Sequence, residues 1–78
     1  MYVEEWIRFT AQTLVDDPKQ VSVNTVEGVQ ATVFELKVAK GDLGKVIGKQ
    51  GRTANAMRNV LQSLSAKHRR RFTLEIVG

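Results

Sequence analysis

The stretch that decides the fold of this chain is residues 44–52, which reads Gly-Lys-Val-Ile-Gly-Lys-Gln-Gly-Arg. Two glycines there bracket a lysine and a glutamine, and glycine lets the backbone turn sharply because it has no Cβ. A helix-forming run, residues 53–67, follows, and a helix begins with unpaired N–H groups and a partial positive charge. Three cations, Lys45, Lys49 and Arg52, stand in this stretch. A bare, positively charged turn of this kind is suited to gripping a phosphate group.

Charge is distributed unevenly along the chain, whose formal net charge is +4. Residues 1–39 carry three cations and six acids, whereas residues 40–78 carry nine cations and two acids. The basic half contains the glycine stretch, which favours a polyanionic partner, with nucleic acid first. A solvated basic face that aids solubility is the alternative, and charge alone does not decide between the two.

Length and composition restrict the remaining possibilities. A chain of 78 residues is expected to form one domain, residues 1–78, and the absence of cysteine excludes disulfides and thiolate metal sites. No apolar run approaches the roughly 18 residues of a membrane span, and no basic leader segment is visible. We therefore expect a cytoplasmic protein without a cofactor.

Hydrophobic periodicity predicts six elements in the order α-β-β-α-α-β. Helices are expected over residues 2–15, 43–47 and 52–67, and strands over residues 20–26, 29–39 and 71–77. Asp42 is a plausible N-cap for the short second helix.

The predicted core follows one stripe of each long helix and alternate positions of each strand. Its members are Val3, Trp6, Ile7, Ala11, Leu14, Val21, Val23, Thr25, Phe34, Leu36, Val38, Ala54, Met57, Val60, Leu61, Leu64, Phe72, Leu74 and Ile76. Tyr2 and Phe9 lie beside the first stripe. We expect them at the edge of the core, and an exposed patch for a partner is the alternative.

The pattern Gly-Lys-x-Ile-Gly-Lys-x-Gly-Arg, opening a helix and flanked by strands, resembles the G-x-x-G loop of a KH domain. Nearly the whole chain is similar to the small bacterial stand-alone KH proteins of the KhpA (YlqC) type. This resemblance implies an α+β fold of type II KH arrangement, with a three-stranded mixed sheet covered on one face by helices.

The resemblance also implies a site that holds about four nucleotides of single-stranded RNA in a groove. One wall would be the glycine loop with its flanking helices, and the other would be the second strand and the nearby hairpin. Val46 is expected to pack inward while Ile47 lines the groove. The residues implied in RNA binding are Lys45, Ile47, Gly48, Lys49, Gln50, Gly51 and Arg52.

The partners implied are RNA, a second copy of the chain and a larger KH protein of the KhpB or Jag type. The implied role is RNA chaperoning or post-transcriptional regulation as a dimer. The alternative is a protein-interaction module that uses the fold to dimerise, with RNA binding secondary. Lys49 and Gln50, which stand between the glycines, favour RNA, since acidic residues there would repel phosphate.

Other classes of site fit the sequence poorly. A P-loop has four residues between its first glycine and its Gly-Lys pair, whereas only three residues separate Gly44 from Gly48 here. Gln50 also stands where a P-loop has the hydroxyl that binds magnesium. The Rossmann glycine motif is absent, and so is a cluster of aromatic residues for stacking bases as in an RRM. His68 is the single histidine, and we expect no enzyme activity and no metal site.

Residues 67–71, Lys-His-Arg-Arg-Arg, form a second basic cluster. They lie about 22 Å along the helix from the glycine loop, at roughly 1.5 Å per residue, and so outside the same four-nucleotide grip. A solvated helix end whose cations favour the helix dipole is the first interpretation. An auxiliary electrostatic contact is the second.

Overall fold

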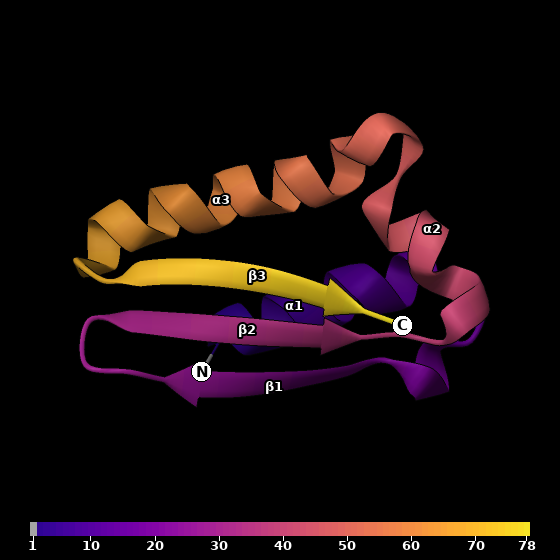
Figure 1. Cartoon of the computed structure of the whole chain (residues 1–78), viewed down its shortest axis with the longest axis horizontal. Coiled ribbons are helices and arrows are strands. Elements are labelled where there is room, and N and C mark those ends of the chain that lie inside the picture. The colour runs from indigo at the N-terminus through magenta and orange to yellow at the C-terminus, as the bar shows by residue number, and fades with distance from the viewer. Residues whose placement is uncertain (1) are drawn as a thin grey trace.

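A computed structural model describes residues 2–78, in which helices pack on a three-stranded sheet (Figure 1). The elements are α1 (Tyr2–Leu14), β1 (Ser22–Glu27), β2 (Ala31–Lys37), α2 (Leu43–Ile47), α3 (Arg52–His68) and β3 (Arg71–Val77). Short 3-10 turns lie at η1 (Pro18–Gln20), η2 (Lys40–Asp42) and η3 (Lys49–Gly51). The predicted order α-β-β-α-α-β is confirmed.

The sheet is mixed, with strand order β1-β2-β3. β1 pairs with β2 antiparallel, and β2 pairs with β3 parallel, so β2 is the central strand. Phe34 of β2 lies opposite Thr25 on one side and Leu74 on the other. The chain therefore leaves the sheet after β2 and returns beside it at β3, and α2, the glycine loop and α3 form the crossover between them (Figure 1).

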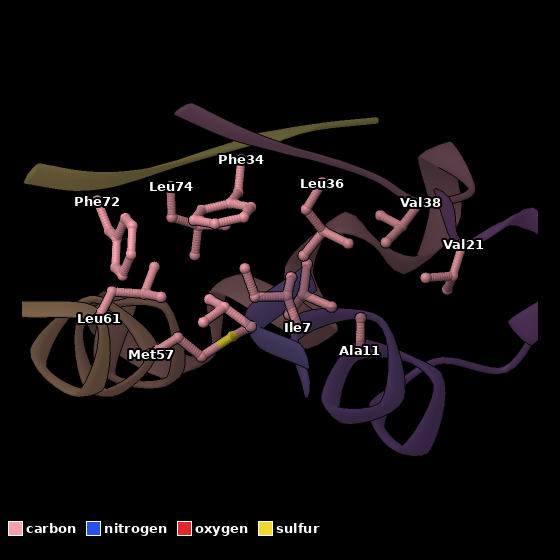
Figure 2. Packing of buried hydrophobic residues seen from close by; sticks show 12 residues of the cluster. Ile7, Ala11, Val21, Phe34, Leu36, Val38, Met57, Leu61, Phe72 and Leu74 are labelled. Carbon is pink, nitrogen blue, oxygen red and sulfur yellow. The ribbon is translucent and has the colours of Figure 1, made fainter. Parts of the chain in front are cut away.

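The core lies between the sheet and the helices, as Figure 2 shows. Alternate residues of β2 and β3 point inward and meet Ile7 and Ala11 of α1 and Met57 and Leu61 of α3. The inward residues of the two strands include Phe34, Leu36, Phe72 and Leu74, and all four are buried. The Phe34 and Phe72 rings meet edge to face with centroids 5.6 Å apart. Full burial of each such side chain stabilises the fold by about 1.5–3 kcal/mol.

Some helix residues predicted to be buried are exposed. Leu14 and Val60 are 37% and 43% exposed, and Tyr2 and Phe9 are 61% and 67% exposed, so the core-edge expectation for the two aromatics is wrong. Tyr2 and Phe9 are seven residues apart, about two helical turns, and share one face of α1. That face points away from the sheet because α1 packs through its Val3–Ile7–Ala11 stripe.

Candidate nucleic-acid interface

The glycine loop turns the chain between α2 and α3 (Figure 1). The Gly48 N–H donates to the Gly44 carbonyl at 2.9 Å and closes α2, and the Gly51 N–H donates to the Gly48 carbonyl at 3.1 Å. Gly48, Gln50 and Gly51 all have positive φ, at 79°, 58° and 75°. Left-handed backbone is unfavourable for residues with a Cβ, so the turn depends on its glycines and on one strained glutamine.

The two glycines of the loop are required for different reasons. A Cβ at Gly48 would clash with the Thr53 side-chain oxygen and lie 2.9 Å from the Thr53 backbone nitrogen. A Cβ at Gly51 would meet nothing closer than the Asn55 amide nitrogen at 3.9 Å. Gly48 is therefore needed for close approach to the start of α3, whereas Gly51 is needed for its backbone conformation alone.

The polar residues of the loop face solvent. Lys49, Gln50 and Arg52 are exposed, and none of their side chains has a hydrogen-bond or ion-pair partner within residues 2–78. No side chain caps the first turn of α3, whose N-cap position is Gly51. The loop thus presents two cations and an amide beside the positive end of a helix of 17 residues.

Of the two apolar residues that precede the loop, one is buried and the other is partly exposed, as predicted. Val46 is fully buried in the core, and Ile47 is partly exposed beside Gly48. The inward turn of Val46 anchors α2 against the rest of the domain. Ile47 is thereby left at the surface next to the loop, where a groove-lining residue is expected.

Lys45 is placed differently from the other cations of the stretch. Its ammonium lies 3.2 Å from an Asp16 carboxylate oxygen and 3.6 Å from one of Asp42. Contact with the Asp16 carboxylate raises the pKa of Lys45 above its usual 10.5. Because Asp16 is largely exposed, the pair is a surface ion pair of modest strength. Lys45 therefore ties α2 to the end of α1 instead of extending freely into solvent.

Asp42 occupies the N-cap position of α2, but its side chain makes no capping bond, so that expectation is wrong in its detail. The carboxylate is 4% exposed and accepts the backbone N–H groups of Asp16 at 3.3 Å and Asp17 at 3.1 Å. Burial opposes its ionisation, but these two N–H groups and Lys45 outweigh it and hold the pKa of Asp42 below 3.8. Asp42 therefore fixes the corner after α1 to the start of α2.

A hollow of about 410 Å³ lies between α3 and β3. It is lined by Arg58, Leu61, Gln62, Ser65, Arg71, Phe72, Thr73 and Leu74. The strand that lines this hollow is β3, the outer strand beside α3, and not β2, the central strand that was expected to form the wall of the groove. Arg58 reaches across and donates to the Leu74 carbonyl at 3.3 Å.

The second basic cluster contains a structural arginine that the sequence analysis missed. The Arg70 guanidinium donates to the carbonyls of Gly28 at 2.9 Å and Ala31 at 3.4 Å, and to the Thr32 hydroxyl at 3.0 Å. A solvated helix end is therefore wrong for Arg70, which joins the β1–β2 hairpin to the turn before β3. The available signal was Thr32, which shares the inward face of Phe34 and needs a partner when buried.

A G-x-x-G turn between two helices, set in a crossover between parallel strands of a small mixed sheet, defines a KH domain of type II arrangement. A family model described as "KhpA/KhpB, KH domain" matches residues 4–76. The chain belongs to this family.

Curated relatives in several bacteria carry the name RNA-binding protein KhpA. The relative in Caldanaerobacter subterraneus is 45% identical over 94% of this chain and 97% of its own length. The relative in Clostridium acetobutylicum is 44% identical over 96% of this chain and all of its own length. The relative in Chlamydia trachomatis is 40% identical and covers 96% of each chain.

Two solved structures share the fold at low identity. Aquifex aeolicus Era, bound to GDP and aluminium fluoride, matches 96% of this chain with a TM-score of 0.64 and 20% identity. An Era complex with MgGDPNP and nucleotides 1506–1542 of 16S ribosomal RNA matches 95% with a TM-score of 0.60 and 23% identity. This chain spans 29% and 28% of those chains, so the likeness concerns one domain of each.

Within residues 2–78, none of the helices is long and apolar enough to cross a membrane. That part of the chain also holds no group of three or more acidic, histidine or cysteine side chains placed to bind a metal ion.

Proposed function

We propose that this protein binds single-stranded RNA, with the glycine loop gripping the sugar–phosphate backbone. The observation that carries the proposal is the outward presentation of Lys49, Gln50 and Arg52 on a turn whose close approach to α3 requires Gly48. The RNA-binding name of its KhpA relatives supports it. Gly48 and Gly51 let the strand approach closely, and the exposed cations neutralise phosphates.

The bases of the bound strand are proposed to lie over Ile47 and the hollow between α3 and β3. That hollow has an apolar floor that includes Leu61, Phe72 and Leu74. About four nucleotides fit a groove of this class. Lys45 contributes by holding α2 in place, and its remaining charge adds to the field at the loop.

Affinity at a single groove is expected to be weak and sensitive to salt. If about three phosphates are neutralised, a plot of the logarithm of the binding constant against the logarithm of the salt concentration has a slope of about −2. Binding then weakens on the order of 20-fold between about 50 and 200 mM salt.

Because one groove offers few contacts, we propose that the protein acts as a dimer, or paired with a larger KH protein of the KhpB or Jag type. Two grooves on one strand gain from effective concentration. The family name, which joins KhpA and KhpB, supports such pairing. The role we propose is RNA chaperoning or post-transcriptional regulation in the cytoplasm, without a catalytic step. Sedimentation of the protein alone and mixed with the larger protein tests the pairing.

The loop is tested by Lys49→Asp combined with Gln50→Asp. Aspartate tolerates the left-handed backbone at position 50, so we expect folding to be kept and RNA affinity to fall about tenfold or more. The chain supplies a matched control in Lys19→Asp with Gln20→Asp, the same dipeptide, exposed in another 3-10 turn. Equal affinity of the loop variant and the control variant would overturn the assignment.

A second candidate function, a docking module with secondary RNA binding, is favoured by the exposure of Tyr2 and Phe9 on α1. The same loop variant separates the two functions. A docking module keeps its cellular partners and its phenotype when the loop is acidic, whereas an RNA-binding protein loses crosslinking to RNA in cells.

A further inference from the structure

A second hollow, of about 680 Å³, lies at the end of α3 opposite the glycine loop. Its lining residues are Val29, Gln30, Ala31, Ser65, Ala66, Arg69, Arg70 and Arg71. In Figure 1 this is the end where the β1–β2 hairpin meets the turn between α3 and β3. We call it the hairpin-end hollow.

The hairpin-end hollow is positively charged without compensation. Arg69 and Arg71 are exposed and form no ion pair within residues 2–78. Arg70 gives its hydrogen bonds to neutral oxygens, so its charge is not neutralised either. No carboxylate lines the hollow, and Glu27 at the end of β1 lies outside its lining. Three guanidinium groups around one cavity suit an anion with several oxygens.

The hairpin-end hollow adjoins the hollow between α3 and β3. Ser65 and Arg71 line both cavities. A strand that leaves the first hollow at the C-terminal end of α3 has the second hollow next to it. Val29, at the hairpin tip, is 95% exposed and offers an apolar contact to a base on this path.

The two ends of α3 are too far apart for one short oligonucleotide grip. From Arg52 to His68 the helix rises about 24 Å at roughly 1.5 Å per residue. That distance exceeds the Debye length of about 10 Å at 0.1 M salt, so the two basic regions act on different phosphates.

We propose that the hairpin-end hollow is a second phosphate-binding site for single-stranded RNA, which extends the bound strand beyond the groove. This inference rests on the proposed RNA-binding function of the glycine loop. The occupant is RNA because the hollow adjoins the proposed groove and presents guanidinium groups. Arg69 and Arg71 make the contacts, and Arg70 holds the hairpin that forms the far wall.

The test is Arg69→Gln, measured with mixed-sequence RNA of four and of twelve nucleotides. Arg71 is left in place because it also lines the hollow between α3 and β3. One lost contact reduces the single-strand salt slope by about 0.7, which at 0.1 M salt weakens binding about fivefold. We expect this loss for the twelve-nucleotide RNA and less than about a twofold change for the four-nucleotide RNA, given the screening length.

The matched control is Lys19→Gln, which removes the same charge from an exposed position outside both hollows. Equal losses in the two variants on the longer RNA would overturn the inference. So would an equal loss of the Arg69 variant on the four-nucleotide RNA, because Arg69 would then belong to the first grip. If the variant loses binding of a polyglutamate peptide but not of RNA, the hollow is a protein-docking site and the inference fails. Failure of the unmodified protein to bind either RNA would instead refute the proposed function.

Discussion

Replacing Gly48 by alanine is predicted to be the most damaging change in the loop. The backbone there, with φ 79° and ψ 170°, lies in a region that glycine alone occupies readily, and an L-residue held there costs about 1–3 kcal/mol. The added Cβ would also lie 2.9 Å from the Thr53 backbone nitrogen. A side-chain rotation cannot relieve a backbone contact, so the start of α3 has to move.

The expected loss is about 3 kcal/mol or more, from strain and clash together. A domain of 78 residues has a total stability of roughly 4–12 kcal/mol, so the change removes a large part of it. For a domain of this size, each kcal/mol of lost stability lowers the melting temperature by about 4–8 °C. We therefore expect the melting temperature to fall by at least about 12 °C. Circular dichroism and urea titration measure both quantities.

Two neighbouring glycines supply graded controls. Gly51→Ala meets no clash but keeps the left-handed strain, and should cost about 1–2 kcal/mol. Gly44→Ala lies in α2 with nothing within 4 Å of its Cβ, and should stabilise the protein by about 0.5–1 kcal/mol. Thr53→Ala added to Gly48→Ala should rescue little, because the backbone nitrogen remains. A Gly48 variant as stable as the Gly51 variant would refute this reasoning.

Three other predictions concern the supports of the interface. Arg70→Met should lower the free energy of unfolding by about 2 kcal/mol, since it leaves the buried Thr32 hydroxyl without its donor. Arg70→Lys should not restore this stability, because an ammonium lacks the planar fork of a guanidinium. Urea titration measures both variants, and full stability of the lysine variant would contradict the geometry. The lowered pKa of Asp42 means that its stabilising effect is present above pH 3.8 and is lost as the pH falls through the lower folded value. In the Asp42→Asn variant, the free energy of unfolding should therefore fall less steeply as the pH is lowered. An equally steep fall in the variant and the unmodified protein would show that the carboxylate stabilises little. Phe9→Ser should change stability by less than about 0.5 kcal/mol, against about 2–5 kcal/mol for Ile7→Ala; a larger cost for Phe9 would show that a partner covers α1 in solution.

Local patterns predicted the elements of the fold because each depends on neighbouring residues. Alternation placed Phe34 and Leu36 inward, and the glycine spacing located the turn between α2 and α3. The division between buried Val46 and partly exposed Ile47 was also predicted, and burial confirms it. The roles proposed for the loop residues in RNA binding stay predictions.

The features that the sequence did not reveal depend on residues distant along the chain. Asp42 binds N–H groups 25 and 26 positions away, and Arg70 reaches residues 38 to 42 positions away. Which strand faces α3 depends on the direction of the crossover, which periodicity does not encode. Helical periodicity placed Tyr2 and Phe9 beside the apolar stripe of α1 but did not show that both side chains are exposed.

The crossover between two adjacent parallel strands has a consequence for synthesis on the ribosome. All the loop residues emerge before Arg71–Val77, yet β3 must pair with β2 before the surface between them and α3 can form. A nascent chain that has exposed every loop cation still lacks the surface between α3 and β3 until Arg71–Val77 has emerged. The cations of the loop are therefore accessible to solvent before the hollow beside them exists.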